Sequence, residues 1–254
     1  EDGTRMRFNG QRIVITGGSS GIGLAMARAF ADQGATVIIT GRTEATLRQA
    51  ASSHPSISGV VCDVSDDEQV VALRDAVESQ GGVDILINNA GVLLAFDVTK
   101  EFALESQLQE IAIDAAGPVR VVHHFLPGML TRPSVLVNVS SGLAYVPYAA
   151  APVYSASKAF LHSYTQSLRA QLAGTSVRVV ELLPPVVDTP MATELDPSFS
   201  KMAPEKLVSA FLNDLSRGKN EIAPGQSTQL KWLSRFAPRV IFGQLNKSPR
   251  GQAA

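Results

Sequence analysis

RIVITGGSSGIG, at positions 12–23, is the most informative part of the sequence. It begins with an apolar, β-branched run, which is typical of a strand buried on both faces. A glycine-rich turn follows at once, and a helical pattern then continues to about Gln33. Glycines at such a turn let the backbone approach a pyrophosphate, which the helix N-terminus stabilises. The stretch predicts a dinucleotide-binding unit, although its glycines stand at Gly17, Gly21 and Gly23 rather than as GxGxxG. A plain glycine-rich turn is the alternative.

Strand and helix patterns alternate along the rest of the chain, starting from this unit. Short β-branched runs predict strands at 12–16, 36–40, 57–61, 84–88, 134–140 and 176–182. Helical patterns are expected near 21–33, 43–52, 66–79, 100–130, 152–172, 204–217 and 228–243. This order is typical of a doubly wound (Rossmann) parallel sheet with helices on both faces, so the sequence predicts the α/β class.

The alternation is not interrupted by a second domain, so we expect one domain over 6–246. Segment 184–204 contains several prolines and is expected to be irregular, in a position to form a lid over a substrate. The ends, 1–5 and 247–254, have no periodic pattern and are expected to be flexible.

Composition argues against several classes of partner. The chain has 254 residues, 45% of them hydrophobic, and a formal net charge of −1. Without a long basic run or a membrane-length apolar run, we expect no nucleic acid and no membrane as partner. The single cysteine, Cys62, excludes an internal disulfide, and no secretory pattern opens the chain, so we expect a cytoplasmic protein. The four histidines show no metal-ligand spacing, and no metal is proposed.

PVYSASKAF, at 152–160, places Tyr154 and Lys158 four residues apart in a predicted helix, so their side chains lie on one face. An aromatic ring covering a lysine stem would give the same spacing. Hydride transfer at an alcohol carbon also requires a proton to move on its oxygen, which a phenol can supply or accept. A neighbouring ammonium favours the phenolate. With a dinucleotide site upstream, we interpret Tyr154 as acid/base and Lys158 as its electrostatic aid.

Three motifs in this order resemble those of the short-chain dehydrogenase/reductase family, in its single-domain branch. They are the glycine turn, NNAG at 88–91, and YSASK at 154–158. The resemblance covers nearly the whole chain, and the runs at 138–172 and 181–189 are most similar to the DltE-like oxidoreductases. The resemblance implies an NAD(P)-dependent enzyme that moves a hydride between nicotinamide and a carbonyl or secondary alcohol.

In this family the end of the second strand selects the cofactor. An acidic residue there favours NAD, and a basic one accommodates the 2′-phosphate of NADP. Here Gly41 stands in place of the carboxylate, and Arg42 follows it. The resemblance therefore implies NADP(H), with NAD(H) as the alternative. Arg42 can also be read as an ordinary surface arginine, since Ser20 occupies the place where some NADP users carry a second basic residue.

The resemblance implies further cofactor contacts. Asp63 matches the family carboxylate that meets the adenine amino group, or it caps the following helix. Asn89 matches the asparagine that fixes the strands and flanks the cofactor, whereas Asn88 and Gly91 can be turn residues. The full predicted cofactor set is Gly17, Ser19, Ser20, Gly21, Ile22, Gly23, Arg42, Asp63, Val64, Asn89, Ala90, Gly91, Tyr154, Lys158, Pro184, Val187 and Thr189.

Two more residues complete the predicted catalytic set of Ser141, Tyr154, Lys158 and Asp114. Ser141 matches the family serine that holds the substrate oxygen, and Ser140 is the alternative. Asp114 stands where the family has an asparagine whose main-chain carbonyl binds a water leading to the lysine. Pro118 has no N–H to bond that carbonyl, so we expect it to be free. The carboxylate either is incidental, tunes Lys158, or marks a helix bend without consequence.

The substrate is expected to be lipophilic, because the segments beside these motifs are mostly apolar. They contain Leu93, Leu94, Phe96, Tyr145, Val146, Tyr148, Val186 and Met191. An NADP-binding regulatory module with weak or no turnover, or an isomerase or dehydratase on the same site, are the alternatives. By its resemblance to the family, and from the apolar helices near 100–130 and 152–172, the chain is expected to form a homodimer or homotetramer.

Overall fold

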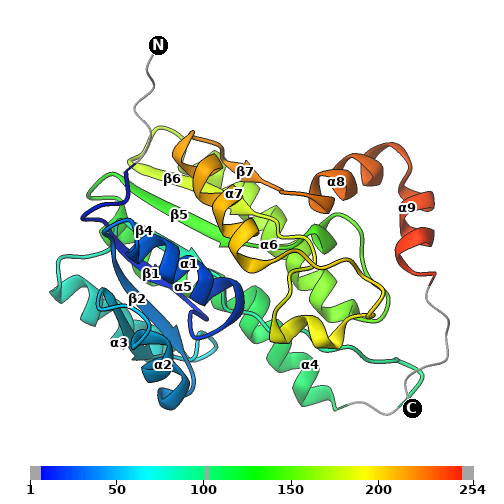
Figure 1. The fold of residues 1–254 in the computed structure, drawn as a ribbon, viewed down its shortest axis with the longest axis horizontal. Coiled ribbons are helices and arrows are strands. Elements are labelled where there is room, and N and C mark those ends of the chain that lie inside the picture. Colours follow the sequence, from blue (N-terminus) through cyan, green and yellow to red (C-terminus); the bar gives the residue numbers. More distant parts are fainter. Residues whose placement is uncertain (1–6, 101–102, 248–254) are drawn as a thin grey trace.

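The sheet is parallel throughout. A computed structural model describes residues 7–100 and 103–247, and its strand order is β3-β2-β1-β4-β5-β6-β7 (Figure 1). The strands are β1 Arg12–Ile15, β2 Thr36–Gly41, β3 Ile57–Val61, β4 Ile85–Asn88, β5 Ser134–Val139, β6 Val177–Leu182 and β7 Glu221–Ile222. This confirms the predicted doubly wound α/β class.

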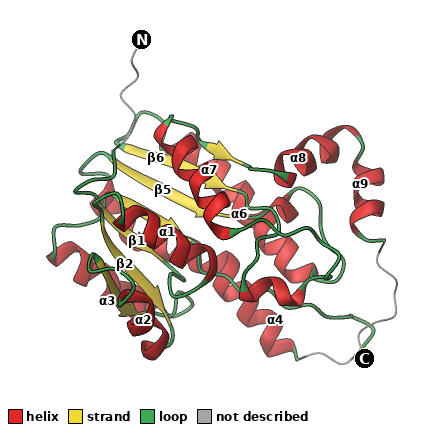
Figure 2. Ribbon diagram, in the orientation of Figure 1, coloured by secondary structure: helices red, strands yellow, loops and turns green. Residues whose placement is uncertain are grey.

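Helices cover both faces of the sheet (Figure 2). They are α1 Gly21–Ala31, α2 Glu44–Ala51, α3 Asp67–Ser79, α4 Leu104–Ile111, α5 Gly117–Met129, α6 Pro152–Gln171, α7 Pro204–Ser216, α8 Gln226–Phe236 and α9 Pro238–Leu245. Strand side chains alternate between two cores: Ile13 and Ile15 join the one that includes α1 and α7, and Val14 joins the one that includes α3 and α5. Because both faces are buried, the strands read as continuous apolar runs.

The strand order reverses between β1 and β4. Their register pairs Ile15 with Ile87, and Ile87 in turn pairs with Val137 of β5. The loops that follow these three strands therefore leave the sheet at the same edge, where open α/β sheets bind ligands.

The helix predicted near 100–130 is divided. A π-helical segment, Ala112–Ala116, separates α4 from α5, and residues 101–102 lie outside the described residues. Pro118 has no N–H for the carbonyl of Asp114, four residues earlier, so a regular α-helical bond is impossible there. The wider turn accommodates that missing donor.

Two further differences concern the C-terminal part. The helix predicted at 228–243 is two helices, α8 and α9, because Pro238 cannot continue the hydrogen bonding of α8. The two-residue strand β7 was missed because so short a segment has no periodicity.

Segment 184–204 is partly ordered by a 3₁₀ turn at Pro190–Glu194 and a bridge between Val187 and Met202. The ends expected to be flexible, apart from Lys247, lie outside the described residues.

Candidate active site

A cavity of about 620 Å³ opens at the carboxyl edge of the sheet. The loops after β1, β4, β5 and β6 form it, together with the start of α6 and the helices α8 and α9. Every residue of the predicted cofactor set lines this cavity, and so do Ser141, Tyr154 and Lys158. Asp114 does not line it. The structure thus brings together residues that lie far apart in the sequence.

The glycine turn fits a pyrophosphate because side chains would not fit there. Gly17 has φ of 65° and Gly21 of 53°, in the region that favours glycine. A Cβ on Gly17 would lie 2.7 Å from the Cα of Ala90, and one on Gly18 would lie 2.6 Å from the Cβ of Ile39. Within the described chain no side chain caps the N-terminus of α1, including that of Ser20. The first N–H groups of α1 therefore suit an anion.

Asn89 connects the turn after β1 to the end of β4. Its amide nitrogen donates to the carbonyls of Thr16 and Gly17, both at 3.0 Å, and its backbone N–H donates to the Thr16 hydroxyl at 3.0 Å. Asn88 instead points away from the cavity and donates to the Asn138 side chain at 2.9 Å. Of the two asparagines, only Asn89 lies at the cavity.

Arg42 and Asp63, the residues predicted to contact the adenosine part of the cofactor, both line the cavity. Arg42 is exposed and borders the cavity, without an ion-pair partner among the described residues. Asp63 accepts hydrogen bonds from the backbone N–H and hydroxyl of Ser65, at 2.9 and 2.7 Å. The suggestion that Asp63 caps the next helix is wrong, because Asp66 caps α3 by accepting from the N–H of Gln69 at 3.1 Å.

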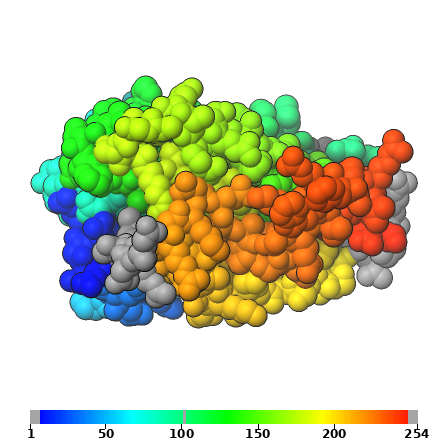
Figure 3. Space-filling view, turned by 90° about the horizontal axis from the view of Figure 1, so that it is seen from above, coloured from blue at the N-terminus to red at the C-terminus, as the bar shows by residue number. Residues whose placement is uncertain are grey.

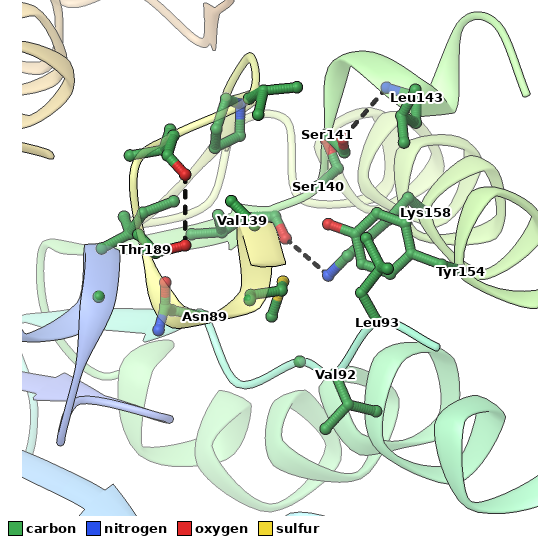
Figure 4. A pocket seen from close by; sticks show the side chains of 18 of the residues that line it. Asn89, Val92, Leu93, Val139, Ser140, Ser141, Leu143, Tyr154, Lys158 and Thr189 are labelled. Atoms are coloured by element: carbon green, nitrogen blue, oxygen red, sulfur yellow. Dashed lines mark hydrogen bonds between the residues drawn. The ribbon is translucent and has the colours of Figure 1, made fainter. Parts of the chain in front are cut away.

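Tyr154 and Lys158 lie one helical turn apart on α6 and face the cavity (Figure 4). The Lys158 Nζ is 5.3 Å from the Tyr154 ring centroid and donates to the Val139 carbonyl at 3.4 Å. Burial raises the pKa of Tyr154, while the Lys158 charge and the Ser141 hydroxyl act to lower that pKa. In the protein alone the phenol is therefore protonated at neutral pH.

The two serines after β5 have different partners. The Ser140 hydroxyl donates to Glu181 Oε1 at 2.5 Å, and this fully buried carboxylate also contacts His162 Nδ1 at 2.9 Å. The Ser141 hydroxyl accepts from the N–H of Leu143 at 3.1 Å, which leaves its own proton to donate. Of the two, Ser141 has the hydroxyl suited to a substrate oxygen.

Asp114 lies directly behind Lys158. It has no exposed surface; its Oδ1 accepts from the N–H of Val92 at 2.8 Å, and its Oδ2 is 3.2 Å from the Lys158 Nζ. Burial raises the pKa of Asp114, against the opposing effect of Lys158. Burial is the largest single effect on the pKa of Lys158 and acts to lower it, but the charges of Asp114, Tyr154 and Glu110 and the hydrogen bond to Asp114 together raise that pKa. The side chain of Asp114 itself is therefore in contact with Lys158.

Glu110, one turn before Asp114, was missed by the sequence analysis. Its side chain is fully buried, and its Oε1 accepts from the N–H of Leu94 at 3.1 Å. Burial, with a smaller effect of Asp114, raises the pKa of Glu110 to about 7. Among the described residues, Oε2 has no hydrogen-bond partner. A second acidic residue four positions before Asp114 in a predicted helix was the available signal.

The walls next to Tyr154 are mostly apolar, but they differ in part from those expected. Leu93, Tyr148, Val186 and Met191 line the cavity as expected, whereas Leu94, Phe96, Tyr145 and Val146 do not. The Tyr145 hydroxyl instead donates to Glu221 at 2.8 Å. The helices α8 and α9 supply walls that the sequence did not indicate, namely Leu230, Leu233, Ile241 and Leu245.

Comparison with known proteins agrees with this geometry. A family profile described as short chain dehydrogenase matches residues 11–199. The Bacillus subtilis (strain 168) protein named uncharacterized oxidoreductase DltE is 36% identical over 250 residues, which make up 95% of this chain and 98% of that protein. Uncharacterized oxidoreductase SSP0419 of Staphylococcus saprophyticus is 34% identical over 212 residues, with 80% and 90% of the two chains covered.

Solved structures show the same fold. A short chain dehydrogenase from Burkholderia cenocepacia J2315, in complex with NADP, matches with a TM-score of 0.84 and 26% identity, over 94% of this chain and 99% of that one. A short chain dehydrogenase/reductase from Burkholderia phymatum, in complex with NAD, has a TM-score of 0.83 and 24% identity, over 97% and 99%. The profile match spans the glycine turn, Asn89, Ser141, Tyr154 and Lys158. The chain therefore belongs to the short-chain dehydrogenase/reductase family of oxidoreductases.

Proposed function

We propose that this protein is an NADP(H)-dependent oxidoreductase acting on a carbonyl or secondary alcohol of a lipophilic small molecule. The observation that carries the proposal is the single cavity shared by the glycine turn, Arg42, Ser141, Tyr154 and Lys158. Its substrate end is walled by apolar side chains, which favour an apolar substrate.

Each catalytic side chain has a role in moving the proton. In carbonyl reduction the Tyr154 hydroxyl donates to the substrate oxygen, for which a raised pKa keeps it in the required acid form. Ser141 donates a hydrogen bond to the same oxygen and stabilises its developing negative charge. Lys158 stabilises the phenolate that remains on Tyr154. NADP(H), when bound, supplies or accepts the hydride.

NADP(H) is preferred to NAD(H) because Arg42 borders the adenosine end of the cavity and Gly41 presents no carboxylate there. The test is to titrate both reduced cofactors against the protein and against Arg42→Asp. We expect tighter binding of NADPH by the native chain and a reversed preference in the variant. Equal affinities in the native chain, or no change in Arg42→Asp, would contradict the proposal.

Tyr154→Phe tests the catalytic role. The variant should bind NADPH as the native protein does and lose nearly all turnover on a carbonyl panel, because only the proton-bearing hydroxyl is removed. Tyr164→Phe, on the same helix, is the matched control and should keep its activity. Native turnover in Tyr154→Phe would refute the mechanism.

The regulatory-module alternative is favoured by one contact, the buried ion pair between Asp114 and Lys158. An isomerase or dehydratase would use the same residues, and product analysis separates that class from simple redox chemistry. Absence of turnover in the native protein, combined with turnover in Asp114→Asn, would favour the regulatory module over the enzyme.

A homodimer or homotetramer through α4, α5 and α6 is the proposed assembly. A groove between these helices is lined mainly by apolar side chains, including Ile111, Val119, Val153 and Phe160. Ile111 and Phe160 are among the exposed large apolar residues. Burying these side chains against a second copy would remove an apolar surface from water.

A further inference from the structure

The helices α8 and α9, Gln226–Leu245, form a hairpin at one end of the molecule, which we call the α8–α9 hairpin. Figure 1 shows it beyond β7, and Figure 3 shows its orange-red atoms on the surface, at the opposite end from the blue N-terminal strand. Its charged residues are Lys231, Arg235 and Arg239, followed by Lys247. All 23 acidic residues of the chain lie before residue 222. The near-zero net charge therefore conceals a hairpin with cations only and an acidic remainder.

The outer face of the hairpin is apolar. Trp232 and Phe236 are 54% and 74% exposed, and their rings stack with centroids 6.0 Å apart. Leu233, Val240 and Phe242 are exposed as well. Large aromatic side chains on the outside of a helix are unusual in water unless they meet another surface.

The inner face of the same hairpin lines the candidate active site. Leu230, Leu233, Ile241 and Leu245 all border the cavity that holds Tyr154. Leu233 belongs to both faces, so the exposed apolar surface continues into the cavity. A lipophilic molecule could pass along this surface without entering water.

We propose that the α8–α9 hairpin binds the surface of an anionic lipid bilayer, with its aromatic face at the headgroup boundary and with Arg235 and Arg239 on lipid phosphates, while Lys231 is paired with Glu221. Aromatic and aliphatic residues combined with Lys and Arg, without acids, are typical of helices that lie in the membrane interface. Trp in particular favours that boundary. The passage of a lipophilic substrate along this surface into the cavity rests on the proposed function, whereas the binding of the hairpin to a bilayer does not.

A second copy of the chain fits this face less well. Two-fold association would place the same patch on both partners, so Arg235 and Arg239 would meet their own positive charges. Surface binding also differs from spanning: among the described residues no helix is long and apolar enough to cross a membrane. The sequence analysis expected no membrane partner because the net charge is near zero and the chain has no long basic run and no apolar run of membrane length. None of these properties describes the local surface of one hairpin.

The chain has one tryptophan, Trp232, so its fluorescence reports directly on the hairpin. We expect a blue shift and co-sedimentation with vesicles of phosphatidylcholine and phosphatidylglycerol, reversed by high salt. Vesicles of phosphatidylcholine alone should give little of either. Absence of binding to the anionic vesicles would overturn the proposal, and so would equal binding to both kinds.

Variants separate the charge from the apolar contact. Arg235→Glu/Arg239→Glu and Phe236→Ser/Val240→Ser should each weaken vesicle binding at least tenfold. Val61→Ser and Arg217→Glu, exposed positions away from the hairpin, are the matched controls and should bind as the native chain does. None of these side chains lines the cavity, so NADPH binding and turnover of a water-soluble carbonyl should stay unchanged.

Sedimentation of the same variants without lipid tests whether a second copy of the chain, rather than a bilayer, covers this face. If the hairpin variants dissociate an oligomer, a second copy covers this face and the proposal is overturned. Failure of the proposed function would instead show as lost turnover or lost NADPH binding in the native protein, whatever the vesicles do.

Discussion

Two buried carboxyl groups and one ammonium group share the space behind Tyr154. Asp114 contacts Lys158, and Glu110 lies one helical turn away, bonded to the backbone at Leu94. Among the described residues, Lys158 is the single cation that acts on either carboxyl group, so the cluster cannot hold both as carboxylates at low cost. Burial raises the pKa of both carboxyl groups, that of Glu110 to about 7.

Glu110→Gln should remove a pH dependence of stability. The pKa of Glu110 is about 7 in the folded protein and 4.5 in the unfolded chain. The folded state therefore binds the Glu110 proton more tightly, and this stabilisation of the fold is fully present below pH 4.5 and is lost as pH rises through 7. The free energy of unfolding of the variant should therefore rise relative to the native protein by up to about 3 kcal/mol over that range. Urea denaturation from pH 5 to pH 8 measures it.

The control is Glu105→Gln, which changes an exposed carboxylate at the start of the same helix. It should leave the pH dependence unchanged. A parallel pH dependence in native protein and Glu110→Gln would show that Glu110 is solvated in the folded state.

Asp114→Asn should shift the pH–rate profile of alcohol oxidation to lower pH. The Asp114 charge raises the pKa of both Lys158 and Tyr154, which titrate as a coupled pair. The rate at the optimum should change by less than about tenfold, roughly 1.4 kcal/mol in the barrier. An unchanged profile would mean that the main-chain carbonyl is the essential group and the charge is incidental. Asp67→Asn, at an exposed position, is the control.

At the scale of elements, a contact between a histidine of α6 and a buried carboxylate of β6 connects the helix to the sheet. His162 follows Tyr154 and Lys158 at the same four-residue spacing, and its Nδ1 lies 2.9 Å from both carboxylate oxygens of Glu181 on β6. Glu181 has no exposed surface, and Ser140 donates its hydroxyl to it. The pair thus links α6 to β6 and, through Ser140, to the end of β5.

His162→Ala should destabilise the protein by about 3 kcal/mol at pH 6, because a buried carboxylate loses its cation. The hydrogen bond to Glu181 raises the pKa of His162 above 6.5, so this contribution is present below pH 6.5 and is lost as pH rises through the raised value. Denaturation at pH 6 and pH 9 should show the larger effect at pH 6.

His124→Ala is the matched control, since its partner Asp67 is 65% exposed and a solvated pair contributes less than about 1 kcal/mol. Equal losses in the two variants would contradict a special role for the buried pair.

At the scale of the whole molecule, two apolar surfaces lie on different parts of the structure. One is the groove between α4, α5 and α6, and the other is the α8–α9 hairpin. Phe160 stands at the groove, 47% exposed and stacked on Tyr164 at 6.1 Å. The groove has the character of a protein interface, whereas the hairpin combines exposed aromatic side chains with Lys231, Arg235 and Arg239 and carries no acidic residue.

Phe160→Glu should lower the mass measured by sedimentation at micromolar concentration, because it places a charge on a mainly apolar surface that would be buried between two copies. Phe242→Glu, an equally exposed aromatic on the hairpin, is the control and should leave the mass unchanged. A native monomer, or a loss of mass in Phe242→Glu alone, would contradict the assembly through the groove.

The fold class and the pairing of Tyr154 with Lys158 could be predicted from local patterns in the sequence. Alternating strand and helix patterns predicted the parallel sheet, because periodicity reports which faces are buried. The Tyr154–Lys158 pair was readable since residues four apart on a helix always share a face. The interruptions at Pro118 and Pro238 follow from a missing N–H, which is also a local property. The sequence analysis nevertheless expected one helix near 100–130, with a free carbonyl at Asp114, and one helix at 228–243.

Only the tertiary structure decided which groups meet across the chain. The contacts of Glu110 with Leu94, Asp114 with Lys158 and Ser140 with Glu181 join different elements. No periodicity encodes such contacts, because they depend on how helices and strands are placed relative to one another. The same holds for the α8–α9 hairpin, whose inner and outer apolar faces are alike in sequence and are distinguished only by what packs against them.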